Sequence, residues 1–338
     1  MKVLLRTDLF KQVEKSGVGR AILHQQQALR KAGVPYTTNP KEEYDIVHIN
    51  TVFPQSYLAA KKAHRQGKKV VFHGHSTEED FRDSFIGSNL LSPLFKKWIS
   101  ACYRTGDVIL TPTPYSKKLL ENYHLKRPII AISNGIELDY FKPEKNWRKE
   151  FRQEFHFQET DKVVIAVGLY LHRKGILDFV QLAKEFPDYK FVWFGYTNLN
   201  TVPKDIRQAV TTKLDNLFFP GYYPRDLLRK AYVGADLFFF PTYEETEGIV
   251  LLEALAAKTP VLIRDIPIYE GWFVDGENVY KGKDITEFRQ KIPAILNREL
   301  PDLTKEGYKV AQARDIQNIG YRLKEIYEDV LAGVEPKD

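Results

Sequence analysis

Four glutamates and a glycine stand close together in the stretch EETEGIVLLEALA, residues 244–256. The last glutamate, Glu253, falls within an apolar run that is typical of a helix, and Gly248 precedes that run. A carboxylate has two acceptor oxygens and can hold both hydroxyls of a cis-diol, so Glu253 is suited to a ribose. Glu245 would reach a ligand from the loop in front of the helix. Alternatively, the first three glutamates only stabilise the start of the helix, and Glu253 lies on the surface.

Two cations occur side by side in the loop AVGLYLHRKGILDF. Arg173 and Lys174 follow one apolar run and precede a glycine and a new helical pattern. The free N–H groups at the start of a helix favour an anion, and the two side chains add positive charge. Phosphates fit this arrangement. The alternative is a basic loop that is simply exposed to water.

A glycine-rich turn, SGVGRAIL, follows the first apolar run of the chain. Gly17 and Gly19 permit a tight turn and a close approach of a ligand to the backbone, and Arg20 stands at the start of the next helical pattern. Glycine-rich turns before helices are common, so an ordinary turn is an equally good interpretation of this motif by itself.

Histidines end another apolar run, in the stretch VVFHGHST, which contains His73 and His75. A histidine in such a place can bind a sugar hydroxyl or carry a proton near neutral pH. For His73 we favour this functional interpretation over a structural one. His48, inside the apolar run DIVHIN, is interpreted as structural.

The elements that position these residues follow from ten short runs rich in Val, Ile, Leu and Phe, with helical stretches between them. Nearly continuous apolar runs of this length indicate strands buried on both faces, and therefore parallel sheets covered by helices. Two such series predict an α/β protein with two doubly wound, Rossmann-like domains that face each other across a cleft. The predicted strands are 2–7, 45–50, 68–74, 107–112 and 128–133 in the first series, and 162–168, 190–195, 217–221, 236–241 and 260–264 in the second.

The seam between the two series lies at roughly 140–160, where a charged segment follows Asn134-Gly135. We therefore predict a first domain at 1–150 and a second at 151–315. In the last segment, 316–338, apolar residues recur with helical spacing, which predicts a terminal helix that docks on the first domain.

The composition excludes several classes of protein. Of the 338 residues, 43% are hydrophobic and 28% are charged, which is ordinary for a folded globular protein. The single cysteine, Cys102, excludes an intramolecular disulfide and fits a reducing compartment. We find neither a signal peptide nor a run of ~20 apolar residues that could cross a membrane. The net charge of +6 suits an anionic partner without identifying it.

Several motifs, in their order along the chain, resemble the family-4 retaining glycosyltransferases, which have the two-domain GT-B fold. They are SNGIELDYF, Lys174-Gly175, PGYYPRDLLRKAYVGADLFFFPT and the spacing of Glu245 and Glu253. The stretches VEKSGVGRA, HGHSTEEDFRDSFIGSNLLSP and IRDIPIYEGW are most similar to the Gram-positive glycolipid synthases that build the lipoteichoic acid anchor.

The resemblance implies roles for the residues that match the family motifs. Lys174 matches the lysine that contacts the donor pyrophosphate, Glu253 the glutamate on the donor ribose and Glu245 the glutamate that faces the transferred sugar. His73 matches a histidine near the reacting sugar. The catalytic residues that the resemblance implies are therefore Glu245, His73 and Lys174.

The other positions concern binding of the donor. The backbone of Thr246, Gly248 and Ile249 matches a segment close to sugar and phosphate, and the turn from Gly17 to Arg20 matches a loop that closes over the phosphates. The arginine that the family has after the strand glycine is Leu169 here. We hypothesise that Arg173 supplies the missing charge. Glu244 and Glu247 have no assigned role, and an apolar residue is usual at the position of Glu247.

The function that the resemblance implies is transfer of a hexose, with retention of configuration, from a UDP-sugar to glucosyl-diacylglycerol at the cytoplasmic face of the membrane. We expect UDP-galactose in preference to UDP-glucose, no cofactor, no metal and no nucleic-acid partner; no Asp-x-Asp pair occurs. The alternatives are a GT-B transferase for a soluble or polysaccharide acceptor and a non-catalytic protein that binds nucleotide sugars. The oligomeric state stays open.

A membrane contact is expected within residues 81–104. In the stretch LLSPLFKKWISACYR, one helical face carries Leu94, Phe95, Trp98, Ile99 and Cys102, and basic residues lie opposite. This pattern is typical of a helix that binds an anionic lipid surface. The alternative is a helix whose apolar face packs on the core of the protein.

Overall fold

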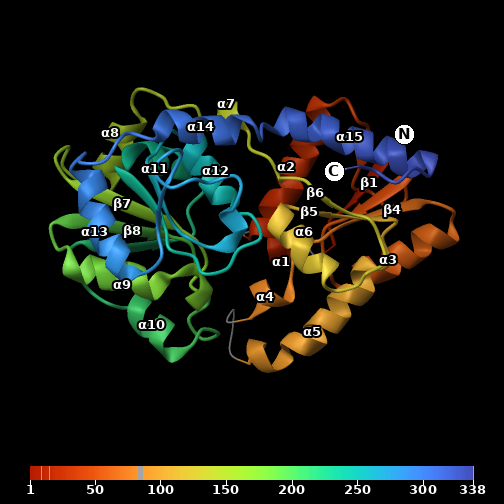
Figure 1. Ribbon diagram of the computed structural model, residues 1–338, viewed down its shortest axis with the longest axis horizontal. Coiled ribbons are helices and arrows are strands. Elements are labelled where there is room, and N and C mark those ends of the chain that lie inside the picture. Colours follow the sequence, from red (N-terminus) through yellow and green to blue (C-terminus); the bar gives the residue numbers. More distant parts are fainter. Residues whose placement is uncertain (9, 15, 83–86, 338) are drawn as a thin grey trace.

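Two parallel sheets, one in each of two domains, organise the chain (Figure 1). They are seen in a computed structural model, which describes residues 1–8, 10–14, 16–82 and 87–337. In these residues each sheet has six strands. The two-domain α/β fold predicted from the sequence is therefore confirmed.

The first sheet has the strand order β2-β1-β3-β4-β5-β6, and all its pairings are parallel. Strands β3 and β5 are buried along their whole length because helices cover both faces, as the continuous apolar runs predict. The strands are β1 (Val3–Arg6), β2 (Tyr36–Thr37), β3 (Ile46–Ile49), β4 (Lys69–His73), β5 (Val108–Thr111) and β6 (Ile129–Ala131).

The second sheet has the order β12-β11-β10-β7-β8-β9 and is also parallel. The chain runs from β7 outward on one side and returns to continue from β10 on the other. The strands are β7 (Lys162–Val167), β8 (Tyr189–Phe194), β9 (Leu217–Gly221), β10 (Leu237–Phe240), β11 (Val261–Arg264) and β12 (Tyr280–Gly282). All ten predicted strands are present. The edge strands β2 and β12 were not predicted, because two or three residues carry no recognisable period.

Helices cover both faces of the first sheet. The helices α2 (Gly17–Lys31) and α15 (Ile316–Ala332) pack on one face, and α3 (Pro54–Arg65), α5 (Ser88–Tyr103) and α6 (Pro114–Glu121) pack on the other. The short helices α1 (Phe10–Val13) and α4 (Glu78–Phe81) lie in the loops that lead toward the second domain.

The second sheet is covered in the same way. Helices α8 (Trp147–Glu154), α11 (Arg225–Gly234), α12 (Ile249–Ala256) and α14 (Thr304–Gln312) cover one face. Helices α9 (Ile176–Glu185), α10 (Lys204–Val210) and α13 (Ile285–Leu296) cover the other. The connecting segment contains α7 (Leu138–Phe141), and two 3₁₀ turns, His172–Lys174 and Pro267–Tyr269, follow β7 and β11.

The C-terminal helix α15 belongs by its packing to the first domain. It lies beside α2 (Figure 1), and its Ile316, Leu323 and Ile326 share an apolar cluster with Val3 and other residues of the first sheet. The helices approach so closely that a Cβ on Gly320 would come within 2.1 Å of the Ala28 carbonyl oxygen, which explains the glycine.

The domain boundary predicted at residue 150 falls within α8. This helix packs on α11 of the second domain, and its Trp147 and Phe151 are buried there, so the second domain includes residues before 150. The charged face of α8 made the segment resemble a linker.

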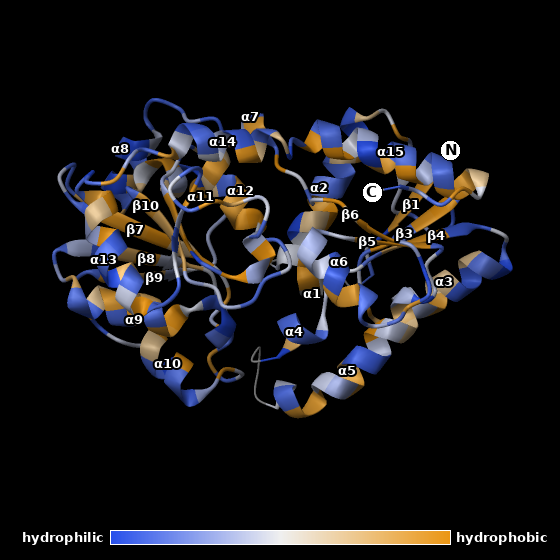
Figure 2. Ribbon diagram, viewed as in Figure 1, coloured by the Kyte–Doolittle hydropathy of each residue, from blue (hydrophilic) through white to orange (hydrophobic). Residues whose placement is uncertain are grey.

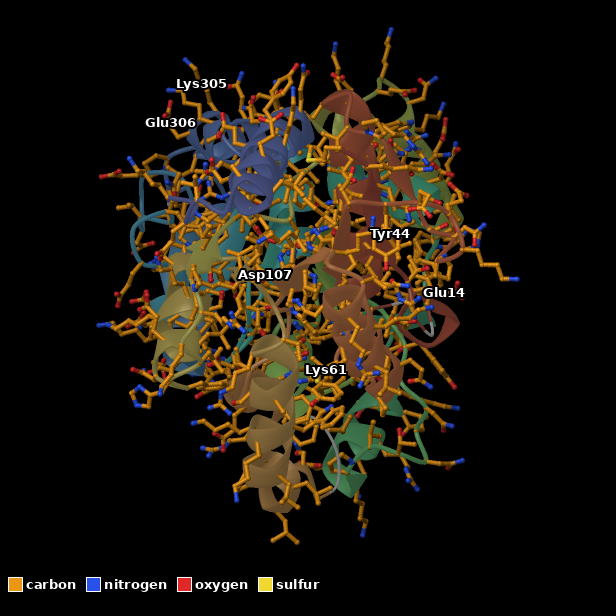
Figure 3. All side chains as sticks on the ribbon, turned by 90° about the vertical axis from the view of Figure 1, so that its right-hand side faces the viewer. Glu14, Tyr44, Lys61, Asp107, Lys305 and Glu306 are labelled. Carbon is orange, nitrogen blue, oxygen red and sulfur yellow. The ribbon has the colours of Figure 1, made fainter. Side chains whose placement is uncertain are left out.

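Apolar residues concentrate on the strands and on the inner faces of the helices (Figure 2). Charged side chains cover the outside. Lys305 and Glu306 of α14, for example, are exposed and point away from the molecule in Figure 3. An exception is the N-terminal end of α5, which is apolar although it is far from the sheet (Figure 2).

Candidate active site

In the second sheet, the order in which the chain adds strands reverses between β7 and β10, which are direct neighbours. Connections from these two strands leave to opposite sides of the sheet, and such a switch point opens a crevice beyond the carboxyl ends of the strands. The loop at 168–175 follows β7, and the loop at 241–248 follows β10. The two loops that carry the predicted cations and glutamates therefore meet here.

A cavity of about 290 Å³ lies at this point, and both domains line it. It brings together most of the residues predicted for the site: Gly17, Arg20, Arg173, Lys174, Glu245, Thr246, Gly248, Ile249 and Glu253. It also contains residues that the sequence analysis did not select, among them Ser16, His75, Asp80, Asn134 and Glu247. The predicted residues Gly19 and His73 do not line it.

Lys174 and Glu245 form a buried ion pair at the wall of the cavity, through Nζ and Oε2. Burial alone would raise the pKa of Glu245, but the Lys174 and Arg173 cations outweigh it and keep that pKa below its ordinary value. Burial lowers the pKa of Lys174, and Glu245 opposes the shift. The pair therefore presents a carboxylate and an ammonium group side by side.

Gly175 fixes the position of this lysine. Its φ is +76°, and a Cβ there would come within 2.3 Å of the Pro241 carbonyl oxygen. Only glycine fits both the left-handed backbone and the tight contact between the two loops. The Lys174-Gly175 motif thus holds the 3₁₀ turn against the end of β10.

Arg173 reaches across the cleft to the first domain. Its Nη1 lies 2.9 Å from Oδ1 of Asp80, which is part of α4, and it also donates to the Glu244 carbonyl oxygen at 3.3 Å. Leu169 lines the same cavity. A positive charge is therefore present at the wall where the family arginine is replaced by leucine.

Glu253 is only 1% exposed, so the surface interpretation of this residue is wrong. Its Oε2 accepts a hydrogen bond from the Tyr232 hydroxyl at 2.9 Å. Its Oε1 has no hydrogen-bond partner among the described residues, and Nε of Arg20 lies 3.7 Å away. A buried carboxylate oxygen without a donor, at the wall of a cavity, is suited to a ligand hydroxyl.

Gly248 precedes α12 with a φ of +83°, a conformation that favours glycine. The residues Thr246 to Ile249 line the cavity, so the N-terminal turn of α12 faces it. Backbone N–H groups at such a turn favour an anion.

Aromatic side chains form part of the cavity wall. Phe194 is the last residue of β8 and Tyr196 follows that strand, while Tyr222 and Tyr223 follow β9. Such a wall suits a flat heterocyclic base. The sequence analysis missed these residues, because aromatic residues after a buried strand resemble core residues when the strand order is unknown.

The histidine that lines the cavity is His75, and not the predicted His73. The His73 ring lies between two others, 4.0 Å from the His75 ring and 5.5 Å from the His48 ring. It is 4% exposed, and neither of its ring nitrogens has a hydrogen-bond partner among the described residues. His73 therefore supports His75 from behind.

Gly19 has a packing role in place of the predicted contact with a ligand. A Cβ on this residue would come within 2.3 Å of the Val13 carbonyl oxygen. The glycine lets the first turn of α2 pack against the segment before it, while Gly17 and Arg20 line the cavity.

The two unassigned glutamates contact the first domain. Glu247 accepts hydrogen bonds from Ser133 and Asn134, and the distance from Asn134 Nδ2 is 2.6 Å. Glu244 accepts one from the Tyr115 hydroxyl at 3.3 Å. Burial raises the pKa of each glutamate to about 7. No local pattern could reveal these contacts, since the partners are more than a hundred residues away along the chain.

Among the described residues, no group of three or more His, Cys, Asp or Glu side chains could hold a metal ion. No helix in the same residues is both long enough and apolar enough to cross a membrane.

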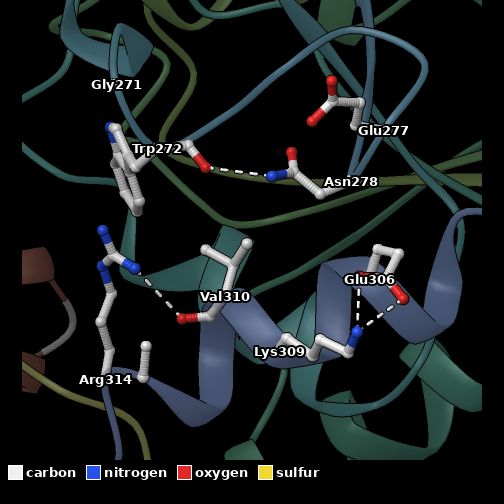
Figure 4. Close-up of a pocket in the computed structure, with 9 residues that line it drawn as sticks. Gly271, Trp272, Glu277, Asn278, Glu306, Lys309, Val310 and Arg314 are labelled. Carbon is white, nitrogen blue, oxygen red and sulfur yellow. Dashed lines mark hydrogen bonds and ion pairs between the residues drawn. The ribbon is translucent and has the colours of Figure 1, made fainter.

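A second cavity, of about 600 Å³, lies between the loop at 271–278 and α14 (Figure 4). Arg314 lies against the indole ring of Trp272, 4.3 Å from its centre, and Lys309 pairs with Glu306 at 2.8 Å. These side chains are thus already paired with one another, and none of the predicted site residues lines this cavity. We therefore place the candidate site in the smaller cavity between the domains.

Two family models match the chain. The model described as glycosyl transferases group 1 matches residues 147–312, and the one described as glycosyltransferase family 4 matches residues 36–140. The sequence is 42% identical to the processive diacylglycerol alpha-glucosyltransferase of Acholeplasma laidlawii, over 98% of this chain and 99% of that protein. It is 24% identical to the alpha-galactosylglucosyldiacylglycerol synthase of Streptococcus pneumoniae, over 80% of this chain and 75% of that protein.

Solved structures agree on the fold. HepE of Anabaena, solved in complex with UDP and glucose, has a TM-score of 0.78 at 14% identity and covers 97% of this chain and all of its own. Sucrose-phosphate synthase from Thermosynechococcus elongatus has a TM-score of 0.72 at 18% identity, with 97% of this chain and 80% of that chain covered. With both domains matched by glycosyltransferase models and a relative 42% identical along nearly its whole length, the chain belongs to the family-4 glycosyltransferases with the GT-B fold.

Proposed function

We propose that this glycosyltransferase moves glucose from UDP-glucose to a diacylglycerol-based acceptor, with retention of configuration at the anomeric carbon. The observation that carries the proposal is the cavity between the domains, where a buried Glu253 oxygen without a hydrogen-bond partner shares the lining with Arg20, Arg173 and Lys174. The sequence alone favoured galactose. We now favour glucose, because the relative that is 42% identical is named as a glucosyltransferase.

We propose one orientation for the donor in the cavity. The aromatic wall takes the uracil base, and the unpartnered Glu253 oxygen takes the ribose hydroxyls. The diphosphate lies between Lys174, Arg173 and the first turn of α12, which leaves the sugar beside Glu245 and His75. Each part of the donor then meets the chemistry that recognises it.

The transfer breaks the bond between the anomeric carbon and a phosphate oxygen. Positive charge develops on the sugar, and negative charge grows on the departing UDP. Lys174, Arg173 and the α12 N-terminus stabilise the departing anion, and the ionised Glu245 stabilises the positive sugar. The acceptor hydroxyl attacks the same face that UDP leaves, and its proton passes to the departing phosphate oxygen.

This scheme assigns no covalent nucleophile, cofactor or metal to the protein. We propose that Lys174 and Arg173 supply the positive charge that a divalent ion supplies in other transferases. Transfer that continues at an unchanged rate in the presence of a chelator supports this part of the proposal, and loss of transfer contradicts it.

The acceptor is reached at a membrane surface through the N-terminal end of α5. There Leu90, Leu91 and Leu94 are 84%, 45% and 64% exposed, and Lys97 is exposed beside them. Exposed leucines next to basic residues are typical of a segment that enters an anionic lipid surface. We propose the cytoplasmic face of the membrane, because UDP-sugars are intracellular substrates.

Of the face of α5 predicted for this contact, Leu94 alone is exposed. Ile99 and Cys102 are fully buried, and Phe95 and Trp98 pack beside them in the core of the first domain. The Trp98 indole also donates a hydrogen bond to the Val52 carbonyl oxygen at 2.7 Å. The expected contact range of 81–104 includes residues 83–86, which lie outside the described residues.

The test is an incubation of the purified protein with UDP-glucose and UDP-galactose in parallel. Diacylglycerol and monoglucosyl-diacylglycerol are offered as acceptors in vesicles, and products are identified by mass. Hexosyl lipid formed from UDP-glucose supports the proposal, and NMR of the new linkage tests retention. Transfer only from UDP-galactose overturns the donor assignment. Transfer to a soluble acceptor without lipid favours the alternative transferase, and UDP-sugar binding with no transfer favours a non-catalytic protein.

A further inference from the structure

A chain of hydrogen bonds joins the cavity to the C-terminal helix. Nε2 of His75 lies 2.9 Å from Oδ1 of Asn50, and Nδ2 of Asn50 donates to Oε1 of Gln25 at 2.8 Å. Nε2 of Gln25 lies 2.9 Å from Nε2 of His48, and Nδ1 of His48 lies 2.6 Å from the hydroxyl of Tyr327 on α15. All five side chains are buried.

The side-chain amide of Asn50 determines which ring nitrogen of His75 donates a hydrogen bond and which one accepts. Because Asn50 uses its Nδ2 to donate to Gln25, its Oδ1 is the atom that faces His75 and must accept a proton from that ring. The Gln25 amide nitrogen lies 2.9 Å from Nε2 and 3.1 Å from Nδ1 of His48, and the Tyr327 hydroxyl, which can donate or accept, holds that ring through Nδ1. A neutral imidazole with its proton on Nε2 has an acceptor at Nδ1.

His75 is held neutral and in a fixed plane. Burial lowers its pKa to about 3, and the His73 ring stacks on it at 4.0 Å with an angle of 8° between the planes. The ring therefore has one orientation and one tautomer, and it lines the same cavity as Lys174 and Glu245.

We infer that Tyr327 on α15 is a positioning residue for catalysis. Acting through His48, Gln25 and Asn50, it holds His75 in the tautomer that offers Nδ1 as a hydrogen-bond acceptor to a hydroxyl of the transferred sugar. This inference rests on the proposed function, and it gives the C-terminal helix a part in the reaction as well as in the packing of the first domain. The sugar hydroxyl donates its proton toward Nδ1 without giving it up, since the imidazole stays neutral.

The test compares Tyr327→Phe with Tyr321→Phe. Both changes remove one hydroxyl from α15, but Tyr321 is 47% exposed and does not belong to the chain of hydrogen bonds that leads to His75. We expect Tyr327→Phe to lower kcat about tenfold, as one hydrogen bond in a linked network implies, with little change in the KM for UDP-glucose. Tyr321→Phe leaves both constants unchanged. Circular dichroism and the affinity for UDP alone check that the variants stay folded.

A double-mutant cycle separates positioning from general damage. If Tyr327 acts through His75, Tyr327→Phe has no further effect on kcat in a His75→Ala background, whereas a purely structural loss adds to it. His75→Asn, which keeps an acceptor near Nδ1, retains more activity than His75→Gln. Additive effects, or an unchanged kcat in Tyr327→Phe, overturn the inference.

The tautomer is measured directly from the ¹⁵N shifts of labelled histidine, with His75→Ala identifying the signal. A proton on Nε2 in the wild type, and mixed tautomers in Tyr327→Phe, are expected. A proton on Nδ1 in the wild type contradicts the acceptor role. These spectra require no turnover, so a failed transfer assay with a fixed tautomer points to the proposed function, and not to the hydrogen-bond chain, as the error.

Discussion

The carboxylate of Glu247 accepts hydrogen bonds from both amides of Asn134, at 3.2 Å from the backbone nitrogen and 2.6 Å from Nδ2. Asn134 belongs to the segment that connects the two domains, and Glu247 belongs to the loop that lines the cavity. The contact therefore ties the position of that loop to the arrangement of the domains. Glu247 is 2% exposed, and burial raises its pKa to about 7 from an ordinary 4.5.

Glu247 should make the stability of the protein depend on pH. Because its pKa is raised in the folded state, the protonated form is favoured there, so its contribution is complete below about pH 4.5 and is lost as the pH rises through about 7. We expect the free energy of unfolding of the wild type, relative to Glu247→Gln, to fall by on the order of 2 kcal/mol between pH 5 and pH 8. Urea unfolding across that range measures the difference.

Glu335→Gln is the control for the Glu247 experiment, since Glu335 is exposed. It changes the net charge equally without removing a buried carboxyl group. Its stability curve should run parallel to that of the wild type. Parallel curves for Glu247→Gln would show that this carboxyl group does not titrate in the range.

Glu253→Gln should weaken the binding of UDP about 10- to 100-fold, because a hydrogen bond to a charged group usually contributes that much to an affinity. The physical reason is that a glutamine offers one neutral acceptor in place of the unpartnered carboxylate oxygen. Calorimetric titration with UDP and with dUDP, which lacks the 2′ hydroxyl, measures the effect. The wild type should discriminate between the two ligands and the variant should not; equal discrimination in both proteins contradicts a ribose contact.

The charges of Lys174 and Glu245 should depend on each other for the stability of the protein, whereas the lysine charge should be needed for activity by itself. Lys174→Met leaves a buried carboxylate alone, so we expect a loss of about 3 kcal/mol in the free energy of unfolding. The same change should lower kcat by about 100-fold or more, because a charge beside the leaving group is lost. Urea unfolding and initial rates of transfer measure the two effects.

The double variant Lys174→Met with Glu245→Gln distinguishes the two effects. Replacing both charges removes the unpaired ion, so most of the lost stability should return while transfer stays slow. A double variant with restored transfer would exclude a role for the lysine charge in catalysis.

The sequence predicts a site residue when its signal is local, and it fails when the role depends on contacts with residues far away along the chain. Lys174 was found because it follows a buried strand and precedes a helix, and Glu253 because it is a carboxylate in the apolar helix that follows another buried strand; the carboxyl edge of a parallel sheet brings such positions together. His75 was passed over for His73. Both occupy the same strand end, and only the packing of the three rings decides which of them faces the cavity.

The face of α5 shows a second limit. The spacing of Phe95, Trp98 and Ile99 correctly marks an apolar face, but a helical period does not say whether that face meets the core or a lipid. In the structure this face packs under the first sheet. The leucines left exposed are those of the first two turns, which extend beyond the core.

The last prediction concerns those leucines. Replacing Leu90, Leu91 and Leu94 together by serine should reduce the affinity for anionic vesicles at least about tenfold, because apolar area that would enter the lipid is lost, while the fold is kept because all three are exposed in solution. Flotation with vesicles measures the bound fraction. Leu331→Ser is the control, since Leu331 is 38% exposed on another helix, α15. Equal losses in both variants, or unchanged flotation of the triple variant, exclude this end of α5 as the membrane contact.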